Sequence, residues 1–578
     1  MTTNDTRSNG LGFSLESRRA TWLIGVAFIV AWPTLAHAQS STPLPPVSVE
    51  SPTMRNKPAR AAATPARAQA APRRTATNRT PPPAPPTPSE RAVAAAAAKY
   101  EQILGYRAMP DSSTLRGATS ALNTSQVVNV VPQQVIRDQR PRNLDDALVN
   151  ISGITQTNTL AGTQDAVIRR GFGDNRDGSI MRNGMPLVQG RSFSAAVDSV
   201  EVLKGPASLL YGIRDPGGIV NTISKRPELY QHGEVTLEGA TYGARSGGNA
   251  TIDLTGPIGK DGLAYRFIGY GINEDYWRNF GTRKETLYAP SLSWYGDTTT
   301  VHLTYEHRDF YSPFDRGTAF SSVTKAPYAI PSTRRIDEPY NSMWGSSDLL
   351  QTSVEQKINE DWKVYAGYSY NSETYNAAQL RNSAITAAGI ATRSNDGTYG
   401  ALTQDSYGTS YIQGSFWLGG MKNDVLFGGE AQYRVIYRKD LVRQAAASFN
   451  IFNPVYDRQL PGTTVVGTDS DQTDKLGTQA LFVQDTLHLT NRVALVGGAR
   501  YMTFDQLAGR GRNPFIANTD LSGNAALPLG GVIVNVTDEL SVYASYTQSL
   551  KPNSTIAPNG AVFSSETKPE EGVSWETG

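Results

Sequence analysis

Segments of about ten residues that alternate apolar and polar side chains recur through the second half of the chain. Clear examples lie at 249–254, 301–306, 362–370 and 540–546. A period of two predicts β-strands with one apolar and one polar face. A soluble β-sandwich and a membrane β-barrel both fit such strands, and about 14 of them are expected between residues 229 and 578.

The lengths of the connections between these segments distinguish a membrane barrel from a soluble sandwich. Short turns alternate with long polar connections along the chain. An outer-membrane barrel has short periplasmic turns and long extracellular loops, whereas a sandwich has no reason to sort its connections by length. The pattern therefore predicts a mainly β protein built as an antiparallel transmembrane β-barrel. The short turns are expected at 257–262, 296–298, 359–361, 419–423, 490–491 and 537–539, with long connections near 272–285, 308–347, 371–405, 437–475, 505–527 and 550–570.

The N-terminus carries the pattern of an export signal. Arg18 and Arg19 precede an apolar run at 20–32, which Ala36-His37-Ala38 follows. A basic start, an apolar core and a small-x-small site are typical of a secretory signal peptide, here 1–38. The run is too short to span a bilayer comfortably as a helix. We therefore expect an exported protein.

Residues 39–114 are rich in Pro, Ala and Arg. Such a segment cannot bury enough apolar surface to fold, so we expect a disordered tether in the periplasm. One short apolar stretch interrupts it at 44–50. Its alternating Val47-Ser48-Val49 could add as a strand to the edge of a partner's sheet.

A small α+β domain is expected at 115–228. Apolar spacing predicts strands at 127–131, 166–168, 179–181 and 200–203 and short helices at 132–136 and 143–150. Glycine-rich turns punctuate the strands.

Three segments of this domain carry a family resemblance. The run Asp198-Ser-Val-Glu-Val-Leu-Lys-Gly-Pro-Ala-Ser-Leu-Leu-Tyr-Gly212, continued by 214–227, resembles the plug domain of TonB-dependent outer-membrane receptors. The segments at 169–174 and 144–148 match other plug segments in the same order. The chain looks most like the ferric-siderophore branch of that family.

The resemblance implies a plug inside the lumen of a barrel of the 22-stranded type. Because about 14 strands are expected here and 572–578 ends within a strand-like segment, we expect the barrel to be incomplete in this chain. By position, Pro46, Val47, Ser48 and Val49 match the TonB box, which implies TonB and its inner-membrane energising complex as partners.

The resemblance further implies a function. The protein is expected to bind a ferric siderophore at the cell surface and import it to the periplasm with energy from the inner-membrane proton gradient. A haem receptor, a cobalamin receptor and a passive pore remain alternatives. The mature His residues lie in or beside expected strands, which disfavours haem; they are His232, His302, His307 and His488.

The amino-acid composition excludes several other classes of function. The 54 Lys and Arg against 52 Asp and Glu give a net charge of +2, so no basic excess indicates nucleic-acid binding. The absence of Cys excludes disulfides, thiol catalysis and Cys-ligated metals. No nucleophile–base pair or metal-ligand spacing stands out. We expect no enzyme, no catalytic residue, no resident metal and no cofactor, with iron arriving only as a siderophore complex.

Five residues are candidates for ligand contact. Arg191 could meet an anionic chelate and Phe193 an aromatic group, with Gln189 beside them in the plug. Tyr311 and Trp344 are candidates from the expected loops, although both also suit an aromatic girdle at the membrane interface.

Charged contacts are expected to hold the plug in the barrel. Arg170 and Arg214 are the plug candidates, and Glu430 and Glu576 are the barrel candidates. Buried ion pairs fix register more than they add stability, which suits a plug that must move. Ordinary solvated lumen charges are the alternative for each residue.

Overall fold

The computed structural model describes residues 105–106, 112–117, 123–173, 178–188, 190–321, 324–465, 471–512, 514–553 and 569–578. The signal peptide expected at 1–38 and the strand-like segment at 44–50 lie outside these residues. Those two expectations therefore stand on the sequence alone.

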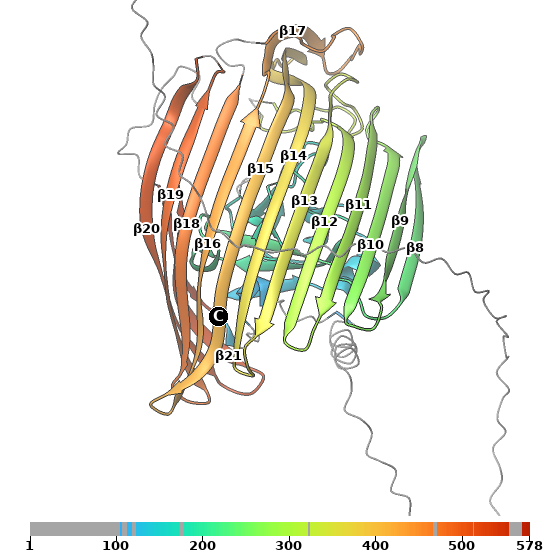
Figure 1. Ribbon diagram of the computed structural model, residues 1–578. Coiled ribbons are helices and arrows are strands. Elements are labelled where there is room, and N and C mark those ends of the chain that lie inside the picture. Colours follow the sequence, from blue (N-terminus) through green and yellow to red (C-terminus); the bar gives the residue numbers. More distant parts are fainter. Residues whose placement is uncertain are drawn as a thin grey trace, which may run out of the picture. The chain divides into compact units, whose positions relative to one another are not determined.

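The part of the chain before residue 225 forms short helices and strands (Figure 1). Its helices are α2 (Ser112–Leu115), α3 (Gln133–Gln139), α4 (Leu144–Ala147) and α5 (Ser208–Tyr211). Its strands are β1 (Val127–Val131), β2 (Ile154–Gln156), β3 (Val167–Arg169), β4 (Ile180–Arg182), β5 (Met185–Pro186), β6 (Val197–Lys204) and β7 (Gly218–Ser224). We call this part the plug domain.

The plug domain is organised around a mixed sheet with the strand order β1-β6-β7-β4-β5. Every residue of the central strand β7 is buried. Val200, Val202 and Val220 pack with Leu144 and Leu148 in its core, together with neighbouring apolar side chains. The two strands β6 and β7 also bury polar side chains, among them Glu201 at 1% exposure and Asn221 and Thr222 at 0%.

A glycine permits the close approach of β6 and β7. Gly218 has φ +103°, and a Cβ added there would lie 2.0 Å from the carbonyl oxygen of Leu203. No side chain fits at that distance, so the pairing of the start of β7 with the end of β6 depends on Gly218.

The rest of the chain forms long antiparallel strands. In chain order these are β8 (His232–Tyr242), β9 (Arg245–Ile258), β10 (Leu263–Asp275), β11 (Thr282–Tyr295), β12 (Thr299–Pro313), β13 (Ser342–Lys357), β14 (Trp362–Ile385), β15 (Ile390–Leu418), β16 (Met421–Arg438), β17 (Val442–Asn450), β18 (Gln472–His488), β19 (Val493–Arg510), β20 (Ile516–Asn535), β21 (Ser541–Lys551) and β22 (Glu570–Thr577).

These strands pair in sequence order from β8 to β22, except that β16 pairs with β18 and β17 pairs only with β15. Among the described residues the continuous path contains 14 strands, with β17 as a side branch. The expected mainly β fold with a large antiparallel sheet and about 14 strands is confirmed.

We call the large sheet from β8 to β22 the wall. Buried and exposed side chains alternate along its strands, as expected when its two faces meet different environments. Along β11, Glu285, Leu287 and Ala289 are buried, whereas Tyr288 and the residues on its side are exposed. The buried set faces the plug domain and the exposed set faces outward. This is the pattern that the period of two predicted.

The short turns gather at one end of the sheet, below the strands in Figure 1. At the other end three expectations are wrong. The long connections expected near 272–285 and 505–527 are only 276–281 and 511–515, because the neighbouring strands β10, β11, β19 and β20 continue up to these turns. The long connection expected near 371–405 does not exist, because β14 and β15 continue to Ile385 and Ile390 and meet in a turn at 386–389. Both faces of this extension are partly polar, so its sequence lacks the alternation that marks the wall.

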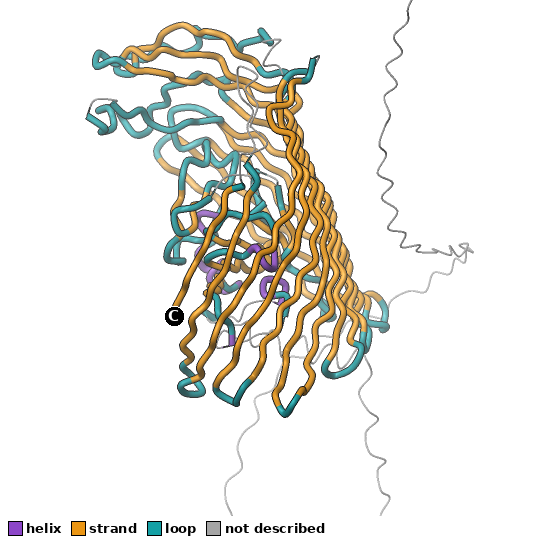
Figure 2. Tube along the Cα trace, turned by 90° about the vertical axis from the view of Figure 1, so that its left-hand side faces the viewer, coloured by secondary structure: helices purple, strands orange, loops and turns teal. Residues whose placement is uncertain are grey.

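The plug domain lies against the concave face of the sheet (Figure 2). One apolar core is shared between them: Leu209, Leu210 and Tyr211 of α5 pack with Phe482 and Val496 of the wall, among others. Within the described part of the chain, no helix has the length and apolarity needed to cross a bilayer.

Candidate functional site

Buried ion pairs join the plug domain to the wall. Arg191 Nη1 lies 2.8 Å from Glu285 Oε2, and Arg308 of the wall reaches the same carboxylate at 3.3 Å. Arg308 also donates to the backbone oxygens of Arg191 and Phe193 at 3.2 and 3.0 Å. This arrangement fixes the plug segment 191–193 to β11 and β12.

A second buried group centres on Glu430 of β16. Its Oε2 accepts from Arg116 Nη2 at 2.9 Å and from the Tyr407 hydroxyl at 2.6 Å. Arg500 of β19 donates to the other oxygen, Oε1. The side chains of Arg116, Glu430 and Arg500 are at most 3% exposed. Arg116 therefore ties the beginning of the plug domain to the wall.

The structure brings together one of the expected plug–barrel pairs. Arg170 and Glu576 form a two-pronged contact at 2.8 and 3.0 Å. Glu430 is paired as expected of a barrel carboxylate, but with Arg116 and Arg500. Arg214 instead donates to the backbone oxygen of Ile213 and lies near the carboxylate of Asp405.

Sequence reasoning missed Arg116 because the residue precedes the first strand in a segment without clear periodicity. Arg116 lies at the start of the domain expected at 115–228, where no spacing of neighbouring residues indicates its partner.

The expected ligand residues of the plug lie in different surroundings. Arg191 is 7% exposed and stands over the ring of Phe310, 5.5 Å from its centroid, in addition to its pair with Glu285. Phe193 packs against the core of the plug domain. Gln189 lies outside the described residues. In this structure Arg191 thus joins the plug domain to the wall and Phe193 serves the plug's own packing, and their contact with a ligand stays a prediction.

Tyr311 and Trp344 lie on the outward face of the wall. They are cross-strand partners on β12 and β13, and Tyr311 is 39% exposed. They line a surface hollow of about 460 Å³ together with Lys284, Asp309 and Asn376. This placement favours the membrane-interface interpretation, and a ligand role for the pair stays a prediction.

A second hollow lies between the plug domain and the wall. It encloses about 410 Å³ and is lined by the plug segment 156–162, by the ends of β10 and β11 and by residues that follow β12. The ring of Trp277 is 43% exposed there. We call this hollow the cup.

Most charges of the cup are matched in pairs. Arg142 meets Glu274 at 2.7 Å, and Arg283 meets the same residue at 3.6 Å. Arg278 meets Asp315 at 3.2 Å, and the Tyr276 hydroxyl donates to Asp315 at 3.0 Å. The cup is therefore a polar recess whose charged side chains are held in place by one another, with the exposed ring of Trp277 as an apolar surface.

The plug side of the cup holds an unusual backbone. Leu160 and Ala161 have φ values of +50° and +64°, a left-handed conformation that is uncommon outside glycine. The side chain of Leu160 packs beside Phe310, Phe314 and Met343, which holds this turn against the wall. Strained turns of this kind concentrate at ligand sites.

A half-buried carboxylate lies behind the cup. Asp145 of α4 accepts a hydrogen bond from the side chain of Gln156, a residue that lines the cup. Burial, and next to it the negative charge of Asp165, raises the pKa of Asp145 to about 6. Asp165 itself accepts from the Ser192 nitrogen and hydroxyl at 2.7 and 2.6 Å.

This shift gives a prediction for Asp145→Asn. The folded pKa lies above the unfolded value, so the folded wild type binds more protons than the unfolded chain between about pH 4 and pH 6. Wild-type stability should therefore fall as the pH rises through that window. We expect the stability of Asp145→Asn to fall less steeply with rising pH than that of the wild type. At pH 7.5 the variant should unfold at a higher temperature than the wild type. Thermal unfolding in detergent at pH 4, 5, 6 and 7.5 measures this. Asp146→Asn, on the exposed side of the same helix, is the control, and an equal change in both variants would contradict the assignment.

Among the residues that the structure describes, no group of three or more His, Asp or Glu is placed to hold a metal ion. The His residues at 232, 302, 307 and 488 all lie within strands β8, β12 and β18.

Comparison with known families covers most of the chain. A family model described as the TonB-dependent receptor plug domain matches residues 120–219, and one described as the TonB-dependent receptor-like β-barrel matches residues 286–578.

Individual relatives are more distant. The metal-pseudopaline receptor of Pseudomonas aeruginosa is 28% identical over 513 residues, which are 85% of this chain and 70% of that protein. The ferrioxamine B receptor of Salmonella typhimurium is 26% identical over 496 residues, which are 81% of this chain and 66% of that protein. The chain thus spans about two thirds of the length of these relatives.

Solved structures show the same fold. The ferric preacinetobactin receptor of Acinetobacter baumannii matches with a TM-score of 0.71 at 18% identity, covering 82% of this chain and 71% of that one. The ferripyoverdine receptor of the outer membrane of Pseudomonas aeruginosa matches with a TM-score of 0.68 at 19% identity, covering 82% and 63%.

Proposed function

Because the chain belongs to the TonB-dependent receptor family, we propose that it binds a ferric siderophore at the cell surface and imports it across the outer membrane to the periplasm. The family is one of receptors rather than enzymes. Relatives named for ferrioxamine, pyoverdine and pseudopaline complexes support a metal chelate as the ligand.

The observation that carries the proposal is the cup. Its volume of about 410 Å³ is within the range of small-ligand sites, and it opens between the plug segment 156–162 and the wall. A ligand in the cup would touch both parts at once. Ligand binding could then be sensed by the plug domain, which is what a gated importer requires and a passive pore does not.

The described His residues support a siderophore over haem. They lie within strands, and three are engaged by polar neighbours: His302 with Ser293 at 2.7 Å, His307 with Asp348 at 2.8 Å and His488 with Asp424 at 2.7 Å. None of these four residues lines the cup.

Import against a gradient needs an energy source. The outer membrane holds no useful ion gradient, so we assign this role to TonB acting on the segment 44–50. The plug contacts at Arg116, Arg170 and Arg191 are then the ones that movement must loosen.

Uptake of radio-iron tests the proposal. Cells that express this protein as their only receptor of the kind are given a panel of ferric siderophores, with and without a proton uncoupler. We expect one chelate class to be imported and its uptake to collapse with the uncoupler, while binding to the cells at 0 °C persists. Uptake that ignores the uncoupler would indicate a passive pore. A receptor that is present in the outer membrane and imports haem or cobalamin but no siderophore would overturn the assigned ligand.

A further inference from the structure

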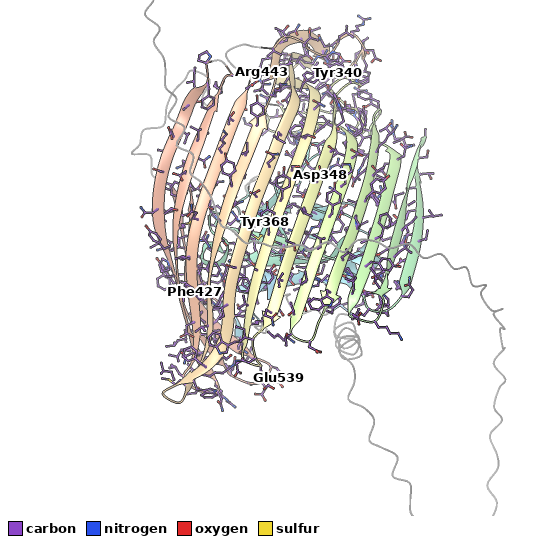
Figure 3. The ribbon with its side chains drawn as sticks, viewed as in Figure 1. Tyr340, Asp348, Tyr368, Phe427, Arg443 and Glu539 are labelled. Carbon is purple, nitrogen blue, oxygen red and sulfur yellow. The ribbon has the colours of Figure 1, made fainter. Side chains whose placement is uncertain are left out.

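Three arginines surround a single carboxylate at the end of the wall where β17 lies. Arg381 Nη2 is 3.0 Å from Asp396 Oδ2, and Arg316 Nη2 is 3.9 Å from the same atom. Arg443 contacts the other oxygen of Asp396. The side chains of the three arginines are 35–51% exposed, whereas that of Asp396 is 7% exposed. We call these four residues the arginine cluster, and Figure 3 marks its position at Arg443.

The cluster is assembled from four separate segments. Arg316 follows β12, Arg381 belongs to β14, Asp396 to β15 and Arg443 to β17. Asp396 and Arg443 are direct register partners, and Gln379, which accepts a hydrogen bond from Arg316, is the register partner of Asp396. The tertiary fold, and not the conformation of a single loop, therefore brings these four side chains together.

Arg316 connects the cluster to the cup. Its chain neighbours Asp315 and Gly317 both line the cup. Its backbone oxygen accepts a hydrogen bond of 2.9 Å from the side chain of Asn158, which also lines the cup from the plug side. A ligand in the cup therefore has the arginine cluster at its border.

The charges of the two regions differ. In the cup, Arg142, Arg278 and Arg283 are offset by Glu274 and Asp315, with Asp275 also in the lining. In the cluster, Arg316 and Arg381 share Asp396 and meet no other carboxylate among the described residues. The border of the cup therefore has more guanidinium groups than carboxylates to pair with them.

Arg316 shows the consequence of this excess. Burial, and next to it the positive charge of Arg381, lowers the pKa of the Arg316 guanidinium. The side chains of Arg316 and Arg381 are 35% and 51% exposed, so an arriving anion can reach them and offset the repulsion between their charges.

We propose that the arginine cluster binds a carboxylate-bearing arm of an anionic ferric chelate whose body occupies the cup. The planar fork of a guanidinium matches a carboxylate in two parallel hydrogen bonds, so this donor set fits a carboxylate arm of a chelate. The inference rests on the proposed function and specifies its ligand as a carboxylate-type chelate rather than a cationic hydroxamate complex.

Equilibrium binding of radio-iron chelates to outer-membrane vesicles that carry the intact protein tests this inference. The probes are ferric dicitrate, which is anionic and carboxylate-bearing, a ferric tris-catecholate, which is anionic without carboxylates, and ferrioxamine B, which is cationic. The variants are Arg316→Gln, Arg381→Gln and Arg381→Lys, which keeps the charge but loses the fork. Arg438→Gln is the matched control, because Arg438 is an exposed arginine at the end of β16 that contacts Gln472 and not Asp396.

We expect the wild type to bind ferric dicitrate more tightly than the other two probes. Loss of one charge-assisted contact should weaken ferric dicitrate binding about tenfold in each Gln variant and in Arg381→Lys, and leave ferrioxamine B and the Arg438→Gln control unchanged. Heat-dependent gel mobility checks that each variant forms the folded barrel.

Three outcomes would overturn the inference. They are tighter wild-type binding of ferrioxamine B or the tris-catecholate, equal losses for all probes, and no loss of ferric dicitrate binding. In each of these cases the protein still binds a ferric chelate, so the proposed function survives. A folded wild type that binds none of the probes and imports no siderophore would overturn both.

Discussion

We expect Glu430→Ala to lower the free energy of unfolding by about 3–5 kcal/mol. The substitution removes the carboxylate that Arg116 and Arg500 share and leaves two buried guanidiniums without their counter-charge. Removal of one partner from a buried ion pair is costly because the remaining charge stays desolvated. Thermal and denaturant unfolding of the purified protein in detergent measures the loss.

Glu576→Ala is the matched control. Glu576 also pairs with a plug arginine, but the side chain of Arg170 is 36% exposed and that of Glu576 is 16% exposed. Solvent screens such a pair, so its loss should cost no more than about 1 kcal/mol. The two variants therefore compare a buried and a part-exposed contact between the same two domains.

Glu430→Ala should also free the start of the plug domain. Arg116 is the residue that anchors the segment after α2 to the wall. We expect limited proteolysis to cleave near 112–117 faster in Glu430→Ala than in Glu576→Ala. Similar stability and similar cleavage in the two variants would show that the buried group does not hold the plug.

The wall was predictable because its physics is local. Each strand faces two different environments, so apolar and polar residues alternate with a period of two in nearly every segment, as along β11. The plug motif at 198–212 was recognisable for a related reason: β6, α5 and the turn at Gly217-Gly218 are buried together, and few residue types fit there.

The candidate site was less predictable because it is built from distant segments. The cup joins residues near 158, 277 and 315, and the arginine cluster joins residues 316, 381, 396 and 443. Polar loop residues have no periodicity that reveals their neighbours. The extension of β14 and β15 beyond the wall, which carries Arg381 and Asp396, has no such periodicity, so its sequence predicts a loop where the structure has paired strands.

Placement on a strand also decides between inward and outward roles. Tyr311 and Trp344 were grouped with loop residues, but the register puts both on the outward face of β12 and β13. A shift of one residue would have turned them to the plug. An aromatic residue near the end of a strand can therefore be assigned to a girdle or to a ligand site only when its register is known.

Val47→Pro is expected to abolish uptake and leave binding intact. Val47 lies in the segment 44–50, outside the described residues, and the prediction follows from the sequence. If this segment pairs as a strand with TonB, proline removes a backbone donor from the ladder and fixes a backbone angle. Radio-iron uptake should fall to the level of uncoupled cells, whereas equilibrium binding at 0 °C should match the wild type.

Val47→Ala separates the backbone from the side chain. Alanine keeps the backbone N–H, so a strand that pairs mainly through its main chain should retain most of its uptake. Uptake by Val47→Pro equal to the wild type would show that 44–50 is not the contact with TonB. If Val47→Pro loses uptake and Glu430→Ala does not, the force that TonB applies reaches the plug domain without the Arg116 contact. If both lose uptake but keep binding, the force applied at 44–50 reaches the plug domain through the segment that Arg116 anchors, and the Glu430 contact is part of the gate.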